Sequence, residues 1–290
     1  MGRLCGAAYS QAGEDTCRRP CDVWLSVLSR AAGARSVTGM KAALRTHSGI
    51  TEIVLVVALY AMYEVVRGFG STTLAAARSH TADIVALERY LGLFIERAVQ
   101  HAVENLPAVP MLLGFAYMSL HFGATAAALI WVHRSHRDRF GLVRTTLVIS
   151  TSISLAIYVL YPAAPPRLAG LGFADTVTEK AVINLSSDAL GSLYNPFAAV
   201  PSLHFGYALL VGVTVAALAR RRWVRWLGAS YPPFMLFTIV ATGNHFIFDA
   251  VAGGIVMVIA YLAARGLLAP RATRPAVVRP RRLIAFPARV

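Results

Sequence analysis

Charged side chains are scarce in this chain. Asp, Glu, Lys and Arg together make up 14% of its 290 residues, whereas hydrophobic residues make up 57% and the mean hydropathy is +0.58. So few charges in so apolar a sequence exclude an ordinary soluble domain and are typical of a polytopic membrane protein.

Lysine is almost missing, because Lys41 and Lys180 are the only two and arginine carries nearly all of the net charge of +14. An excess of this size could indicate nucleic-acid binding, which needs a basic face. Here the basic residues lie in loops between long apolar runs, so nucleic acid is excluded as a partner. We expect the basic loops to contact anionic lipid headgroups instead.

Cysteine is nearly absent too. The chain has three, Cys5, Cys17 and Cys21, and an odd number without paired C-x-x-C spacing predicts neither a disulfide framework nor a zinc site. The sequence also lacks a Gly-rich nucleotide loop and a carboxylate cluster for a divalent metal. We therefore expect chemistry that needs no metal and no cofactor.

What the chain has in abundance is apolar runs, six of them, each near the roughly 20 residues that cross a bilayer. They cover residues 50–66, 108–132, 142–161, 198–219, 223–242 and 246–268. The predicted fold is all-α, a polytopic six-helix transmembrane bundle over residues 50–268. Residues 1–49 are predicted to be a disordered cytoplasmic segment, with Met40 an alternative start to Met1, and residues 269–290 an Arg/Pro-rich cytoplasmic tail.

Basic residues set the expected orientation. They flank the first run and fill the second-to-third and fourth-to-fifth loops, whereas the third-to-fourth loop holds only Arg167 and Lys180 and the fifth-to-sixth holds none. Both termini are therefore predicted to be cytoplasmic in a multi-pass protein of the cell membrane, with the ends that carry His204 and His245 facing outward. Residues 84–99 carry apolar residues at helical spacing, which predicts either an amphipathic helix on the outer membrane surface or a plain packing helix.

His245 and Asp249 form the sharpest chemical motif. Their spacing places a carboxylate over the histidine on one helix face. A carboxylate that accepts a proton from one ring nitrogen leaves the other nitrogen to attack phosphorus. Spacing alone leaves two interpretations open: a poised nucleophile, or a buried pair that only ties helices together.

His204 stands one intervening span earlier, on the same predicted face, where it can act as general acid for a leaving oxygen. Pro201 suits the first turn of a helix, and the free amides of that turn with the Ser202 hydroxyl would form an anion site. Arg167 closes the third run on the same face, where a guanidinium could hold phosphate oxygens. A headgroup-contacting arginine is the alternative.

Five further residues are weaker candidates. Glu64 and Arg67, at the outer end of the first run, either pair with one another or contact substrate. Asp175 and Asn195, in the outer loop, could bind a polar headgroup. His121 lies near the middle of the second run, deeper than the expected site, and a structural core histidine is the favoured interpretation there.

Pro201-Ser202-x-His204 and His245-x-x-x-Asp249 resemble the motifs of the type 2 phosphatidic acid phosphatase superfamily of lipid phosphatases. The resemblance implies that His245 is the phosphorus nucleophile, that Asp249 supports it and that His204 protonates the leaving group. Leu203 replaces the usual glycine, and Ile239 stands where an arginine is expected. The superfamily has a further, earlier motif, of which this chain keeps only the end, Pro165-Pro166-Arg167, without the lysine. Arg167 or Arg67 would take the place of the missing arginine in holding the phosphate.

In these departures the chain resembles one branch of the superfamily, the inositol phosphorylceramide synthase-like, inositolphosphotransferase-type members. That branch has a Pro-Pro element after the third span and Pro-Ser-Leu-His at the fourth. The resemblance implies a lipid phosphotransferase with a phosphohistidine intermediate, a phospholipid or polyprenyl phosphate as substrate and a polyol or sugar as acceptor. A lipid phosphate phosphatase that uses water is the alternative. A non-enzymatic lipid or anion transporter is disfavoured, because His121 is the only ionisable side chain deep in a run.

Overall fold

The computed structural model describes residues 57–58, 61–62, 64, 73–176 and 195–269. Within these residues the chain is helical and contains no β-strand. The elements are α4 (Leu74–Tyr90), α5 (Glu96–Glu104), α6 (Val109–Phe115), the π-helical turn η1 (Ala116–Leu120), α7 (His121–Ser135), α8 (Arg137–Leu160), the 3-10 turn η2 (Pro166–Leu168), α11 (Leu203–Leu218), α12 (Arg222–Ala241) and α13 (Ile247–Leu268).

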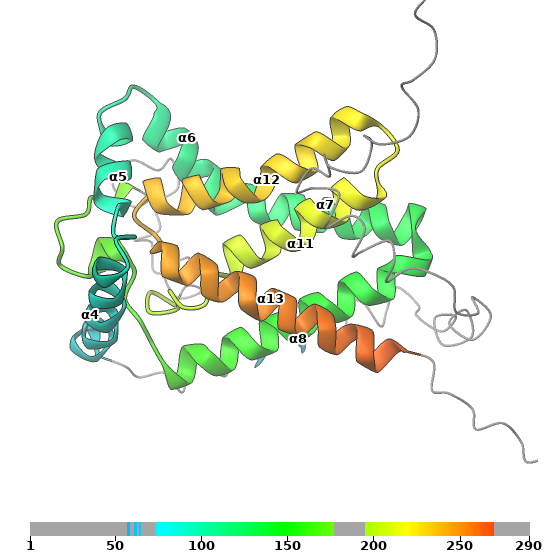
Figure 1. The fold of residues 1–290 in the computed structure, drawn as a ribbon, viewed down its shortest axis with the longest axis horizontal. Helices are drawn as coiled ribbons and strands as arrows, with labels where there is room; N and C mark the ends of the chain where they lie inside the picture. The colour runs from blue at the N-terminus through cyan, green and yellow to red at the C-terminus, as the bar shows by residue number, and fades with distance from the viewer. Residues whose placement is uncertain (1–56, 59–60, 63, 65–72, 177–194, 270–290) are drawn as a thin grey trace, which may run out of the picture.

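Helix α11 lies at the centre of a bundle. It packs against α7, α8, α12 and α13, and α13 packs in turn along α8. Figure 1 shows α11 between α12 on one side and α13 and α8 on the other. The α11 side chains are apolar almost all round, as expected for a helix with neighbours on every side.

Among the described residues, three stretches are long and apolar enough to cross a membrane: Val109–Ser135, which runs through α6, η1 and α7 without a break, Arg137–Leu160 and Ile247–Leu268. They correspond to the second, third and sixth predicted spans. The fourth is α11, which is apolar but shorter, and the fifth is α12, a helix that contains Pro232 and Pro233. The first span lies mostly outside the described residues, as do residues 1–49 and nearly all of the tail, so the six-span topology stays a prediction.

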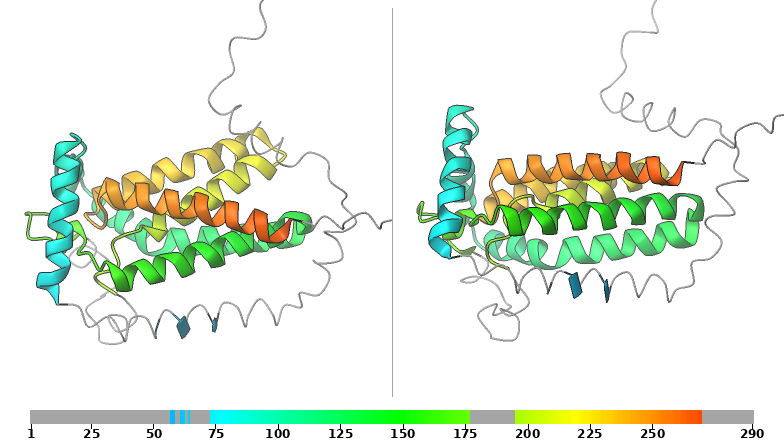
Figure 2. Two further views of the ribbon diagram at one scale, coloured as in Figure 1. Left: turned by 60° about the horizontal axis from the view of Figure 1, so that its bottom comes forward. Right: turned by 90° about the horizontal axis from the view of Figure 1, so that it is seen from below.

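The expected amphipathic helix over residues 84–99 is wrong in its bounds. The segment consists of α4 and α5, separated by residues 91–95, because Gly92 adopts a positive φ of 69° that ends the first helix. Helix α4 runs across one end of the bundle, roughly perpendicular to the other helices (Figure 2).

The side chains of residues 84–99 differ in their exposure. Leu87, Leu91 and Ile95 are exposed, whereas Glu88 and Glu96 are 1% and 0% exposed. Ile84 and Val85 of α4 are buried as well, so the apolar residues of this segment are not gathered on one outward face, and its place on a membrane surface stays a prediction. The acidic face is buried because its carboxyl groups accept hydrogen bonds from the start of α13.

Candidate active site

His245 and Asp249 are in contact at the start of α13. The His245 Nδ1 atom lies 3.2 Å from Asp249 Oδ2, and both side chains are buried. The same carboxylate oxygen accepts the Phe246 N–H at 2.9 Å, and Phe246 is the residue that caps the helix. His245 therefore precedes the helix rather than standing in its first turn, and the contact is part of a cap, not the helix-face pairing that the spacing predicts.

This contact fixes the imidazole. If Asp249 is ionised it can only accept, so this contact favours the tautomer with the hydrogen on Nδ1 and the lone pair on Nε2. The arrangement gives His245 one defined nucleophilic nitrogen.

His204 stands in the first turn of α11, and its ring centroid lies 5.6 Å from that of His245. The two helix starts are joined directly, because the Ser202 N–H donates to the Asp249 main-chain oxygen at 2.9 Å. Two histidines this close can act on one phosphorus, with one as nucleophile and the other as proton donor. We call His204, His245 and Asp249 the histidine site.

A glycine allows the two helices to approach so closely. A Cβ atom on Gly253 would lie 2.3 Å from the Ser202 carbonyl oxygen, a distance that no real side chain tolerates. Any larger residue at position 253 would push the start of α11 away from α13. The separation of the two histidines therefore depends on this small residue.

Ser202 is fully buried and caps α11, where its hydroxyl accepts the Phe205 N–H at 3.4 Å. The amides at the start of α13 are occupied as well: those of Phe246, Ile247 and Phe248 donate to Asp249, Glu96 and Glu88. The start of α13 is thus capped by carboxyl groups. The expected role of Ser202 in phosphate binding stays a prediction.

Two rings from the second predicted span pack against His204. Tyr117 stacks on it with centroids 4.1 Å apart and planes 15° apart, and the His121 centroid lies 4.0 Å away. The expectation that His121 lies deeper than the site is therefore wrong. The π-helical turn η1 changes the register of the helix just before His121, as such turns often do beside functional sites. Tyr117 was not predicted, although its spacing of four from His121 was a usable signal.

Arg167 lies in η2, and its backbone N–H donates to the Gly243 oxygen at 3.0 Å. Its guanidinium contacts the Asn244 side-chain oxygen, and its Nε lies 3.6 Å from Asp175 Oδ2. The chain thus holds this cation beside the residue that precedes His245. Asp175 is placed here as the partner of Arg167, and Asn244 was not predicted.

The remaining candidates are less connected to the histidine site. Asn195 accepts the Phe197 N–H at 3.0 Å in the turn that returns to α11. Glu64 is a half-buried helical residue, and Arg67 lies outside the described residues. Roles for these three in substrate binding stay predictions. In the described part of the chain no group of three or more His, Cys, Asp or Glu side chains is placed to hold a metal ion, and metal-independent chemistry also stays a prediction.

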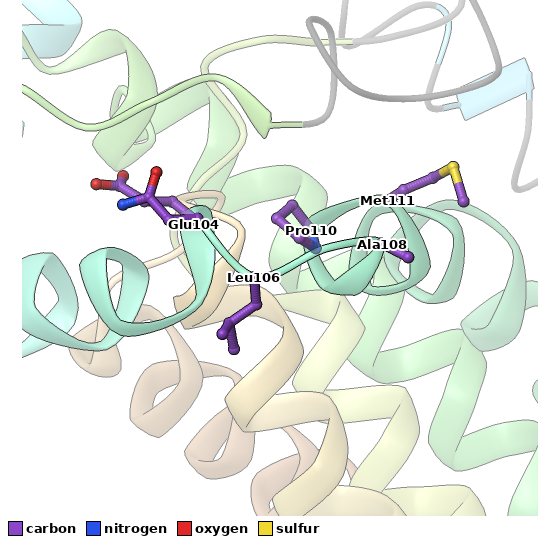
Figure 3. Close-up of a pocket in the computed structure, with 6 residues that line it drawn as sticks. Glu104, Leu106, Ala108, Pro110 and Met111 are labelled. Atoms are coloured by element: carbon purple, nitrogen blue, oxygen red, sulfur yellow. The ribbon is translucent and has the colours of Figure 1, made fainter.

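A surface hollow of about 320 Å³ lies at the connection between α5 and α6. Figure 3 shows Glu104, Leu106 and Pro110 among its lining residues. Neither Arg167 nor any residue of the histidine site lines this hollow. The hollow therefore lies apart from the histidine site.

In a comparison with protein families, a family model described as the PAP2 superfamily matches residues 82–263. The matched residues include the histidine site, Arg167, α5 and the second half of α4. Comparisons with curated proteins and with solved structures find no significant match.

Proposed function

The chain belongs to the PAP2 superfamily, and we propose that it is a membrane lipid phosphotransferase that works through a phosphohistidine on His245. The superfamily supports activity on lipid phosphate esters by a membrane protein. The observation that carries the proposal is the 5.6 Å separation of the His204 and His245 rings, with Asp249 bound to Nδ1 of the latter.

The reaction proceeds in two halves. In the first, Nε2 of His245 attacks phosphorus, the bond from phosphorus to the leaving oxygen breaks, and protonated His204 gives that oxygen its proton. In the second, neutral His204 takes the proton of an acceptor hydroxyl, whose oxygen attacks phosphorus as the phosphorus–nitrogen bond breaks. Both histidines return to their starting states, so atoms and charges balance over one cycle.

Arg167 is the proposed phosphate ligand. Guanidinium groups bind two non-bridging oxygens at once, and contacts with Asn244 and Asp175 hold this one in place before substrate arrives. In this proposal Arg167 takes the place of the arginine that the superfamily motif expects at position 239, where the chain has a fully buried isoleucine.

Burial supports transfer over hydrolysis. His245 is 4% exposed and Asp249 is 0% exposed. A transferase must keep water from its covalent intermediate, and a site with so little access to solvent suits that need. A polyol or sugar hydroxyl is the proposed acceptor, in keeping with the inositol phosphorylceramide synthase-like branch. A phosphatase would perform the same first half and use water in the second.

We further propose that the histidine site faces outward. The arginine-rich turns lie at the opposite end of the bundle, where Trp131 and His136 line one hollow together with Arg220 and Arg221. Such clusters of arginine are expected on the cytoplasmic side. Leu171 can be replaced by cysteine and intact cells treated with an impermeant thiol reagent. Labelling at position 171 would support this orientation. Labelling at that position only after lysis would contradict it.

The test uses purified protein in lipid nanodiscs with EDTA, supplied with phospholipid and polyprenyl phosphate donors, with and without inositol or another polyol. We expect a new phosphoester that depends on the acceptor and disappears in His245→Ala, a diester from a diester phospholipid donor and a monoester from polyprenyl phosphate. His133→Ala, a histidine at the other end of α7, is the matched control and should keep activity. Phosphate release that ignores the acceptor would replace transferase with phosphatase. A His245→Ala variant that retains turnover would overturn the phosphohistidine.

A further inference from the structure

Two acidic side chains from outside the bundle are buried against the start of α13. Glu96 Oε1 accepts the Ile247 N–H at 2.9 Å, and Glu88 Oε1 accepts the Phe248 N–H at 2.7 Å. These glutamates are 0% and 1% exposed. We call Glu88 and Glu96 the acidic clamp, because each holds one amide of the first turn of α13, which follows His245.

Three negative charges at this place would repel one another strongly. A single carboxylate at a helix N-terminus is favourable, but Asp249 already caps the same turn. The second oxygens of Glu88, Glu96 and Asp249 are all buried, and in the described part of the chain none of them has a hydrogen-bond partner. Within the same residues neither glutamate forms a salt bridge.

Neighbouring arginines are turned elsewhere. The Arg89 guanidinium lies 5.0 Å from the centroid of the Phe94 ring, and the Arg97 guanidinium lies 5.8 Å from that of Phe173. The two carboxyl groups of the clamp bind successive amides of one turn, those of Ile247 and Phe248, and this brings them together at one place. One shared proton would give the pair a single negative charge and supply the hydrogen bond that its buried oxygens lack.

We propose that Glu88 and Glu96 are positioning residues for His245, which share one proton and fix the start of α13 by holding the amides of Ile247 and Phe248. This inference rests on the proposed role of His245 as nucleophile. It assigns to α4 and α5, which lie across the end of the bundle in Figure 2, the task of setting the direction of the imidazole. A displacement of the nucleophile by about 1 Å can cost roughly 100-fold in rate, so such support is worth a large factor.

The electrostatics of the clamp agree with a shared proton. Burial, followed by the charge and hydrogen bond of Glu96 and the charge of Asp249, raises the pKa of Glu88 from its ordinary value of 4.5 to about 8, against the opposing effect of the Phe248 amide. The groups that face Glu88 are thus Glu96 from α5 and Asp249 from α13. Above this pH the proton is lost, and a further negative charge beside Asp249 loosens the turn. Activity should therefore decline on the alkaline side.

Conservative and disruptive variants separate positioning from simple packing. In Glu88→Gln the amide oxygen can still accept the Phe248 N–H, while the NH2 group replaces the shared proton and donates to Glu96. We expect wild-type kcat at pH 7 and an alkaline decline that lacks the step near pH 8 caused by Glu88. In Glu88→Ala and Glu96→Ala the acceptor is gone, and kcat should fall about 10- to 100-fold with little change in the KM for lipid. Asp138→Asn, which changes an exposed carboxylate in the first turn of α8, is the matched control.

A spectroscopic readout covers the case in which the alanine variants fold poorly. The infrared absorption of a protonated carboxyl should be present in the wild type at pH 7, disappear as the pH rises past 8, and be absent from Glu88→Gln. No such absorption would overturn the shared proton. Folded alanine variants with wild-type kcat would overturn positioning. A wild type that turns over no phosphoester at all would instead contradict the proposed function, and the infrared result would still decide whether the proton is shared.

Discussion

The starts of α11 and α13 look alike in sequence and differ in construction. Each follows a turn, brings a histidine to the same end of the bundle and meets the other through the bond from Ser202 to Asp249. The start of α11 is capped by its own serine, and His204 packs against the rings of Tyr117 and His121. The start of α13 is capped by acidic residues from α4, α5 and α13 itself.

The difference separates two tasks. Carboxyl groups around α13 keep an imidazole in one tautomer and one direction, which a nucleophile needs, and they make that helix start a poor place for a phosphate. His204 packs against the rings of Tyr117 and His121 instead, and proton transfer is the task that we propose for it. An incoming phosphate is therefore expected between the α11 start and Arg167, on the side of His245 away from the acidic clamp.

Removing the carboxylate cap of α13 should have the largest effect. In Asp249→Asn the imidazole loses the acceptor that fixes its tautomer, and we expect kcat to fall on the order of 10⁴-fold, as when the carboxylate that orients a catalytic histidine is replaced by an amide. In Ser202→Ala the α11 start loses only a helix cap, worth about 1 kcal/mol of stability. Rates of phosphodiester formation and melting temperatures of both variants make the comparison. Equal losses of kcat would contradict the division of tasks.

His204→Ala should cost about 10²–10⁴-fold with a lipid donor, because the leaving oxygen no longer receives a proton. The loss in the first half of the reaction should shrink greatly with a nitrophenyl phosphoester, whose leaving group departs as a stable anion. A rapid burst of nitrophenolate from the variant is the expected observation. If both donors suffer alike, His204 supports the site in some way other than as general acid.

Gly253→Ala tests whether the two starts must touch. The added methyl group would meet the Ser202 oxygen at 2.3 Å, so the helices must separate and both the melting temperature and kcat should fall. Gly266→Ala lies in the same helix with nothing within 4 Å of the added carbon and serves as the control. We expect that control to keep its activity and to gain slightly in stability from better helix propensity. A fully active Gly253→Ala would show that the separation of the histidines tolerates change.

The sequence predicts most of the helices and the contact between His245 and Asp249, but not the local geometry that forms the histidine site. Apolar runs locate α7, α8, α11 and α13 because lipid-length helices need little else to be recognised. The contact between His245 and Asp249 is also predicted, yet from a helix-face spacing, whereas the structure forms it as a cap. His121 is misplaced because a π-helical turn alters the register that a regular period assumes.

The acidic clamp escapes prediction for a different reason. On an amphipathic pattern Glu88 and Glu96 read as the polar side of a surface helix. Their partners Phe248 and Ile247 are 160 and 151 residues away in the chain, and backbone amides leave no trace in the sequence. Only the position of α4 across the end of the bundle brings them together. Long-range contacts with the main chain are the kind of interaction that spacing rules cannot find.

The last expected effect concerns stability rather than rate, and its sign follows from the clamp. The folded protein keeps the proton of Glu88 up to pH about 8, whereas the unfolded chain releases it near 4.5. Between these values the folded state binds more protons, so the free energy of unfolding decreases as pH rises, by at most about 1.4 kcal/mol per pH unit for this group, and levels off above 8. Melting temperatures at pH 5, 6.5 and 8 should therefore decline less steeply in Glu88→Gln than in the wild type, while Asp138→Asn should follow the wild type. A slope unchanged by Glu88→Gln would mean that the clamp is ionised in the folded protein, and the start of α13 would then differ from that of α11 in shape alone.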